Sequence, residues 1–393
     1  MTAMAGPLPQ PIDLLHHYRD HGRSFVAART IKSGEVILSE KPILLYPSAS
    51  TTTSSSYCHR CFRSLPPDKA FVPCFTCGTP FCSVNCHSIA ATSLHTPFVC
   101  RAYCLFESTR KEKPFVFDEE QVLFLIAAYN LALVNPGDFH LLLSLHGRGD
   151  PTKASTVLLH DFIVSLHDAT HHELSVIVTA DLLAKDAMNA FGLMEGYDKS
   201  MVNGNMKLVR GYGIYVYASC FNHDCLPNVC RFDYLDRDSN DSNDSYGQNS
   251  NTEISIRAIH EISQGNEICL SYFPVNWTYN ERQHRLKEDY GFQCSCDRCL
   301  VEKKWNTGVV EEDDAMESAK NSNEEFPHAY FFLNFMCSRL NCGGTLAHLP
   351  PSVEGVVSDQ LECSGCGIIR HKDDIDYDVD DDDDESDEDM IED

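Results

Sequence analysis

The segment Asn222–Asn228 reads N-H-D-C-L-P-N, and it separates two stretches that predict buried structure. Upstream, residues 211–218 (G-Y-G-I-Y-V-Y-A) combine apolar side chains with two glycines that permit close backbone packing. Downstream, residues 229–234 (V-C-R-F-D-Y) are typical of a β-strand. A polar, conformationally special segment between packed elements is expected to serve a chemical role.

Two more segments with distinctive residues follow the Asn222–Asn228 segment along the chain. Residues 267–272 (E-I-C-L-S-Y) predict a strand that ends in a tyrosine, and residues 290–299 read Y-G-F-Q-C-S-C-D-R-C. Residues 290–299 supply three thiolates, one fewer than a closed structural zinc site needs. Together the three segments resemble the core of SET-domain protein lysine methyltransferases, whose central motif is N-H-x-C-x-P-N.

Composition indicates a folded protein with a sizeable core. The chain has 393 residues, of which 43% are hydrophobic, and this length allows two or three domains. No run of eighteen apolar residues predicts a membrane span, and residues 1–11 lack the features of a secretory signal. We therefore expect an intracellular protein of the nucleus, the cytoplasm or both, with its 19 cysteines reduced and available as metal ligands.

The charge balance argues against nucleic-acid binding as the main activity. The net charge is −27, and residues 373–393 contribute fifteen acidic residues and no basic one. Electrostatic binding to nucleic acid needs a clustered positive surface, so a basic protein or peptide is the better-matched partner. The acidic tail itself has two interpretations, a solvated segment or one that attracts or inhibits at a basic substrate channel.

Eight potential zinc ligands follow a polar connector at residues 48–56. Because a segment of this length with few large apolar side chains cannot fold by burial alone, metal binding must supply folding free energy. The spacing resembles a MYND finger, and this resemblance implies two interleaved zinc sites. The alternative is non-crossed ligation, in which consecutive ligand pairs bind the same zinc ion. The resemblance assigns Cys58, Cys61, Cys82 and Cys86 to one zinc ion, and Cys74, Cys77, His95 and Cys100 to the other.

Two further sites complete a prediction of four zinc ions. By resemblance to the family, Cys225 joins the three cysteines of the post-SET segment as the fourth ligand. Near the C-terminus, two cysteine pairs followed by glycine predict the knuckles of a zinc ribbon, because glycine lets the backbone turn toward the thiolates. The two ligand sets are Cys225, Cys294, Cys296 and Cys299, and Cys337, Cys342, Cys363 and Cys366.

The resemblance also implies roles for individual side chains. Tyr272 is the expected catalytic residue, at the inner mouth of a lysine channel, and Tyr290 is the expected channel wall. S-adenosylmethionine is the implied cofactor, with Phe292 stacked on its adenine ring. Its full set of candidate contacts is His21, Gly22, Arg23, Asn189, Asn222, His223, Tyr272 and Phe292. Ser24 stands where the family often has a second glycine, and this difference affects the expected shape of the loop formed by residues 21–24.

The predicted fold is a mostly β, pseudoknotted SET fold interrupted by a helical insert and accompanied by small zinc modules. The chain resembles short plant-type members of the SET-and-MYND family, which lack a helical-repeat C-terminal domain. The predicted divisions are an N-terminal SET part (12–47), a MYND finger (57–104), a helical insert (114–210), a C-terminal SET part (211–275), a post-SET segment (276–303), a zinc ribbon (330–371) and an acidic tail (372–393).

The function implied by the resemblance is methyl transfer to lysine side chains of proteins. Histones are the expected substrates by family analogy, and other basic proteins are equally compatible with the motifs. The MYND finger is expected to bind proline-containing peptides. The alternative is a zinc-finger scaffold with a degenerate SET core, although Asn222, His223, Tyr272 and Tyr290 are all retained, as an enzyme requires. We expect neither a membrane partner nor strong direct binding to nucleic acid.

Overall fold

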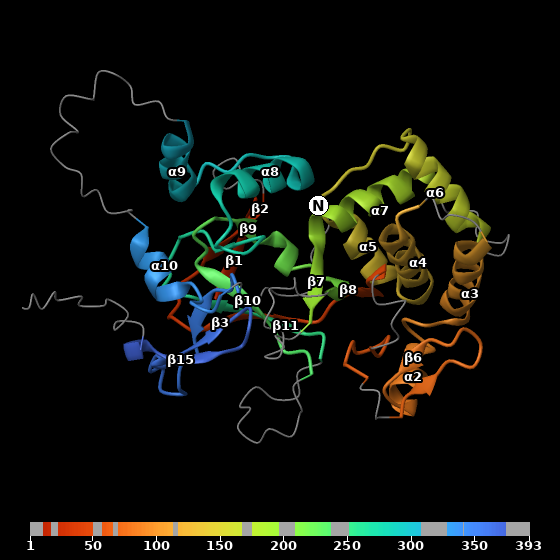
Figure 1. Ribbon diagram of the computed structural model, residues 1–393, viewed down its shortest axis with the longest axis horizontal. Helices are drawn as coiled ribbons and strands as arrows, with labels where there is room; N and C mark the ends of the chain where they lie inside the picture. The colour runs from red at the N-terminus through yellow and green to blue at the C-terminus, as the bar shows by residue number, and fades with distance from the viewer. Residues whose placement is uncertain are drawn as a thin grey trace, which may run out of the picture.

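The computed structural model describes residues 11–16, 23–49, 57–65, 70–112, 117–166, 175–195, 209–236, 251–307, 328–340 and 342–374. Small β-sheets occupy one side of the molecule, and a group of helices occupies the other (Figure 1). Strands build the surroundings of the central motif, whereas helices make up much of the remainder. None of the helices in these ranges is long and apolar enough to cross a membrane.

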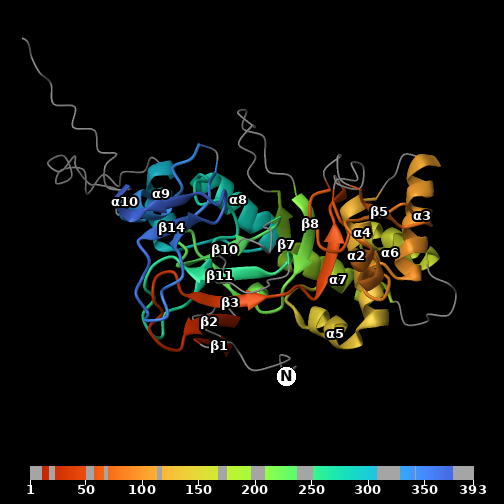
Figure 2. The ribbon, with the colours of Figure 1, turned by 90° about the horizontal axis from the view of Figure 1, so that it is seen from below.

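The main sheet brings together strands from both ends of the predicted SET region. Strands β10 (Val229–Asp233), β11 (Ile254–Ala258) and β3 (Val36–Glu40) form an antiparallel sheet in that order. Beside it, β1 (Ile12–His16) pairs with β2 (Arg23–Ala27), and Figure 2 shows these strands following one another across the molecule. Their apolar side chains share one buried cluster, so the polar central motif is anchored to a packed core.

A second sheet connects this core to the helices. It has the order β4 (Leu44–Pro47), β8 (Val209–Ile214) and β7 (Ala190–Met194), with all neighbours antiparallel. Gly211 in β8 is required by close packing, because a Cβ there would lie 2.3 Å from the ring of Phe62. β7 is an edge strand of this sheet, and it borders the site described below.

The helical insert forms its own core over the second sheet. Its helices within the predicted bounds 114–210 are α4 (Glu119–Val134), α5 (Pro136–Ser144), α6 (Ala154–Ser165) and α7 (Val176–Asn189). α3 (Pro97–Glu112) precedes these bounds, carries the finger ligand Cys100 and packs on the same core. Asp118 caps α4, because its carboxylate accepts hydrogen bonds from the backbone N–H groups of Glu120 and Gln121. α4 is buried along most of its length, and α7 leads directly into β7.

The remaining elements belong to the cysteine-rich parts of the chain. β5 (Val72–Pro73), β6 (Pro80–Phe81) and α2 (Val84–Ala90) form the small module seen beside the helices in Figure 1. α8 (Tyr279–Tyr290) and α9 (Asp297–Thr307) follow the central core. α10 (Ala329–Phe335) precedes an antiparallel sheet of β13 (Leu346–His348), β14 (Gln360–Cys363) and β15 (Ile369–His371), which packs against β10 and β11.

Candidate active site

The central motif is held by a short parallel pairing between two distant segments. β9 (Asn222–His223) pairs with β12 (Cys269–Leu270), which places the motif beside the residues that precede Tyr272. The Asn228 side chain secures the same strand, because its Nδ2 donates to the carbonyl of Glu267 at 2.8 Å and its Oδ1 accepts from the backbone N–H of Cys269 at 2.8 Å. The two ends of the motif therefore both bind the segment 267–270, Asn222 through backbone pairing and Asn228 through its side chain.

The Asn222 side chain links three elements at this point. Its Nδ2 donates to Ser24 Oγ and to Glu267 Oε1, both at 2.8 Å. Ser24 lies in β2 and is fully buried, so the hydroxyl that replaces the family's glycine is used as an internal acceptor. Arg23 begins the same strand, whereas His21 and Gly22 lie outside the described residues.

Tyr272 is held in one orientation by contacts at both of its ends. Its backbone N–H donates to His223 Nδ1 at 3.2 Å, and its hydroxyl donates to the carbonyl of Phe221 at 2.9 Å. Its ring lies against that of Tyr290, with 4.9 Å between the centroids. Burial raises the pKa of Tyr272, so its hydroxyl stays protonated at neutral pH.

His223 is neutral in this setting. Burial lowers the pKa of His223 to about 4, and its Nε2 lies 3.3 Å from the sulfur of Cys225. Since Nδ1 accepts the hydrogen bond from Tyr272, the imidazole proton is on Nε2 and faces the Cys225 sulfur. The imidazole thus connects the Tyr272 segment to a cysteine cluster.

That cluster joins the motif to the segment after α8. The sulfur atoms of Cys225, Cys294, Cys296 and Cys299 all lie within 4.8 Å of one another. Arg282 from α8 is completely buried and donates from Nε to Cys225 Sγ at 3.2 Å, and it forms an ion pair with Glu302 at 2.6 Å. A buried guanidinium beside a sulfur favours the thiolate form that metal ligands require.

The other predicted ligand sets are also brought together, each within 4.8 Å. The finger uses the interleaved grouping, because Cys58 and Cys61 meet Cys82 and Cys86 while Cys74 and Cys77 meet His95 and Cys100. The ribbon set comprises Cys337, Cys342, Cys363 and Cys366.

The spacing between these sulfurs tests whether zinc fits. With Zn–S bonds of about 2.3 Å, tetrahedral geometry requires sulfur atoms about 3.8 Å apart. The sulfur separations run from 3.4 Å between Cys82 and Cys86 to 3.9 Å between Cys225 and Cys294, with 3.5 Å between Cys342 and Cys363 and 3.8 Å between Cys337 and Cys366. These values lie close to the tetrahedral spacing, so the donors fit zinc.

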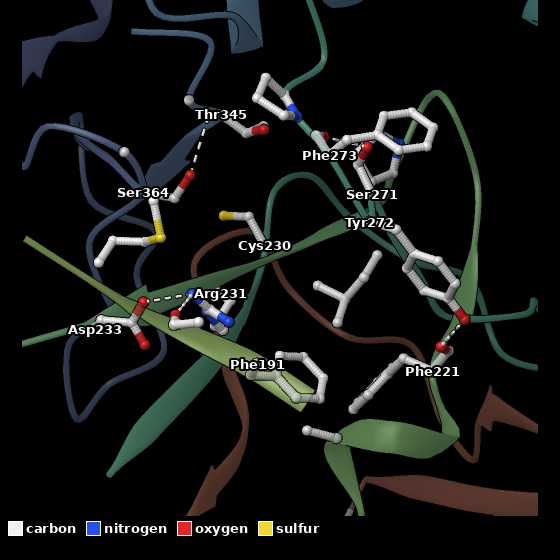
Figure 3. A pocket seen from close by; sticks show the side chains of 18 of the residues that line it. Phe191, Phe221, Cys230, Arg231, Asp233, Ser271, Tyr272, Phe273, Thr345 and Ser364 are labelled. Atoms are coloured by element: carbon white, nitrogen blue, oxygen red, sulfur yellow. Dashed lines mark hydrogen bonds and ion pairs between the residues drawn. The ribbon is translucent and has the colours of Figure 1, made fainter. Parts of the chain in front are cut away.

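A cavity of about 440 Å³ is lined in part by Tyr272. Tyr272 and Phe221 stand at one end, with Tyr290 nearby, and Phe191 of β7 and Cys230 of β10 line the middle (Figure 3). Asn189 also lines it; its Nδ2 donates to the carbonyls of His146 and Lys185 at 2.8 and 2.7 Å.

The predicted cofactor residues do not all border the cavity. Asn189 and Tyr272 do, as does the predicted channel residue Tyr290, whereas Arg23, Asn222, His223 and Phe292 do not. Phe292 is 39% exposed and follows Gly291, which ends α8 in the left-handed conformation at φ 75°.

Comparisons with known proteins agree with this geometry. The SET domain family model matches residues 22–273, more than half of the chain. The chain belongs to the SET-domain family. Histone-lysine N-methyltransferase ASHR2 of Arabidopsis thaliana is 41% identical over 93% of this chain and 97% of its own length.

More distant relatives carry the resemblance that the motifs indicate. A SET and MYND domain-containing protein of Dictyostelium discoideum is 35% identical over 24% of this chain and 19% of its own length. Protein-lysine N-trimethyltransferase SMYD5 of Mus musculus is 32% identical over 27% of this chain and 23% of its own length. The resemblance to SET-and-MYND methyltransferases is thus confirmed.

Some site residues of this SET-family protein were not predicted from its sequence. Arg282, which contacts the Cys225 sulfur, sits in a charged helical segment with no local signal of burial. Thr345 and Ser364 of the ribbon line the cavity together with Arg231 and Asp233 of β10 (Figure 3). Strand alternation places Arg231 and Asp233 on one face, but only tertiary packing shows that this face meets the ribbon.

Proposed function

We propose that this SET-family protein transfers the S-methyl group of S-adenosylmethionine to lysine side chains of basic proteins, including histones. The observation that carries the proposal is the fixed Tyr272 hydroxyl at the inner end of a cavity lined by Tyr290 and Phe221. Family membership and the 41% identity to a histone-lysine N-methyltransferase support the same chemistry. The chain is therefore a protein lysine methyltransferase.

The chain's own residues have three tasks in this reaction. S-adenosylmethionine, when bound, supplies a methyl group on a sulfonium sulfur and leaves as the neutral thioether. The protein must align the lysine nitrogen for in-line displacement, exclude water, and accept the amine in its neutral form. Since a free lysine has a pKa near 10.4, an apolar channel favours loss of the proton before transfer.

Tyr272 orients the reacting amine. Its hydroxyl oxygen is fixed by donation to the Phe221 carbonyl, so its lone pairs are left to accept from the incoming amine and from polarised C–H groups. The Tyr290 ring forms the adjoining wall of the channel. Asn222 and His223 would hold the amino-acid end of the cofactor on the other side, and Phe292 would stack on the adenine ring.

We further propose four zinc ions and the module assignments that accompany them. The finger (57–104) is a MYND module, and the post-SET segment (276–303) closes the cofactor pocket in a pseudoknotted arrangement. The ribbon spans residues 330–371. The sulfur spacing of the clusters supports zinc at these positions. Phe75, which is 97% exposed between two finger ligands, supports peptide binding at the finger.

We also propose that the substrates are basic proteins and that the protein acts in the nucleus, the cytoplasm or both. The cavity lining holds the Arg231–Asp233 ion pair, at 2.7 Å, and one further carboxylate, Glu195, so its net charge is negative and favours a basic segment. Histones would require action in the nucleus, and other basic proteins are compatible with nucleus or cytoplasm.

The test is transfer of labelled methyl groups to core histones and to whole-cell protein extract, with Tyr272→Phe alongside the unsubstituted protein. Label that depends on Tyr272 supports the proposal. Equal labelling by Tyr272→Phe would contradict the role of Tyr272, and no labelling by zinc-replete protein that does not bind the cofactor would contradict the activity.

A further inference from the structure

The wall of the cavity opposite β7 comes from the C-terminal ribbon. Figure 3 shows Thr345 and Ser364 on the ribbon side, across the cavity from Phe191. All the ribbon residues beyond Cys342 that line the cavity are small, namely Gly343, Gly344, Thr345, Ser364 and Gly365. A wall of small residues leaves room for a polypeptide to approach closely.

The ribbon is attached directly to the segment that carries Tyr272. The backbone N–H of Val275 donates to the carbonyl of Gly343 at 3.3 Å. Gly343 has φ 60°, and a Cβ at this position would lie 2.6 Å from Asn276 Oδ1 and 2.7 Å from Pro274 Cβ. Only glycine fits this contact without displacement, so the ribbon wall has a defined position relative to Tyr272.

A buried ion pair holds the other side of the ribbon. Arg257 of β11 and Glu362 of β14 have side chains 1% and 3% exposed, with 2.9 Å between Nη2 and Oε2. The Arg257 guanidinium lies over the Phe232 ring at 3.6 Å, and the Tyr234 hydroxyl donates to Glu362 at 3.2 Å. Phe232 and the ribbon residue Leu361 share one apolar cluster, so the ribbon packs as part of the core.

The two knuckles are also joined to each other at the cavity. The backbone N–H of Thr345 donates to Ser364 Oγ at 3.0 Å, and the backbone N–H of Ser364 donates to the Thr345 carbonyl at 2.9 Å. The sulfurs of Cys342 and Cys363, one from each knuckle, lie 3.5 Å apart. The shape of the wall therefore depends on the knuckles that the cysteines hold together.

We propose that the ribbon wall, defined as Gly343–Thr345 with Ser364 and Gly365, binds the polypeptide flanking the target lysine and selects substrates by size. This inference rests on the proposed function. The occupant is a substrate segment because the same cavity contains the Tyr272 hydroxyl at its other end. Small wall residues admit a bulky neighbour of the lysine, and added bulk at Ser364 excludes it.

The experiment uses the full-length, zinc-loaded protein and a library of lysine-centred peptides that vary at the flanking positions. Ser364→Tyr adds bulk to the wall, and Ser364→Ala removes the hydroxyl without adding bulk. Val353→Tyr is the matched control, because Val353 is fully exposed on the same ribbon and lies outside the cavity. The readouts are the KM for each peptide, the Kd for S-adenosylmethionine and the zinc content.

We expect Ser364→Tyr to raise the KM about tenfold for peptides with large flanking residues, with unchanged cofactor Kd and zinc content. Val353→Tyr should match the unsubstituted protein. Ser364→Ala loses the hydrogen bond from the Thr345 N–H but adds no bulk, so its KM should not depend on the size of the flanking residues. An unchanged peptide profile in Ser364→Tyr, or an equal loss in Ser364→Ala, would overturn the inference while leaving the methyltransferase activity intact. If the unsubstituted protein methylated no peptide and no protein substrate, the proposed function would fail and the inference with it.

Discussion

The buried ion pair between Arg257 and Glu362 yields a quantitative prediction. Substitution Glu362→Gln preserves the shape of the side chain but leaves the Arg257 guanidinium charged and 1% exposed. Removing one partner of a buried pair costs about 3–5 kcal/mol. Since the glutamine oxygen can still accept a hydrogen bond, we expect the lower end, about 3 kcal/mol.

This loss should be confined to the ribbon and its contact with β11. A change of about 3 kcal/mol raises the population of the detached ribbon by about a hundredfold. Amide hydrogen exchange at β14 should therefore accelerate by about that factor, while exchange in α4 is unchanged. The measurement is native-state hydrogen exchange by mass spectrometry on zinc-replete protein.

Two further substitutions serve as controls for Glu362→Gln. Asp289→Asn breaks the more exposed pair with Arg285 on α8, whose side chains are 35% and 56% exposed, so it should cost less than about 1 kcal/mol. The double substitution Arg257→Met with Glu362→Leu should recover most of the lost protection, because it removes the unpaired charge. Unchanged exchange at β14 in Glu362→Gln would refute this account of how the ribbon is held.

Two other predictions concern metal content and pH. Inductively coupled plasma mass spectrometry should find about four zinc ions per chain. Cys74→Ser should keep about three and Cys104→Ser all four, because of these two cysteines only Cys74 belongs to a ligand set. Equal zinc content in the two variants would contradict the assignment. Burial raises the pKa of Asp186 to about 7, although the hydrogen bond from Tyr46 opposes this shift. The folded protein therefore binds a proton at Asp186 more tightly than the unfolded chain does, and the stability gained from this proton is lost as pH rises from about 4 to 7. Asp186→Asn should therefore gain about 2–3 kcal/mol relative to the unsubstituted protein between pH 5 and 8 in denaturant titrations, and a constant difference would contradict the assignment.

The parts of the site that were predictable are those with a local chemical signature. Cysteine spacing in the finger and ribbon reflects tetrahedral geometry, so the ligand groups are visible in the sequence before folding. Tyr272 was identifiable because it ends an apolar strand after a polar motif that resembles a known family.

The parts that were not predictable depend on contacts between distant segments. Arg257 and Glu362 are 105 residues apart, and each lies in a strand whose pattern does not indicate a buried charge. Within the predicted helical insert (114–210), α7 ends at Asn189 and residues 190–194 form β7, which pairs with β8 of the second sheet. The cofactor role predicted for Phe292 stays a prediction, since the ring is 39% exposed.

The most direct test of the central claim is methyl transfer by Tyr272→Phe compared with the unsubstituted protein, with cofactor binding measured on both. Loss of the hydroxyl removes the only polar atom of this side chain, which is anchored on the Phe221 carbonyl. We expect the rate of transfer to fall by about a hundredfold or more while the Kd for S-adenosylmethionine changes less than about threefold. Full activity in Tyr272→Phe would contradict the account.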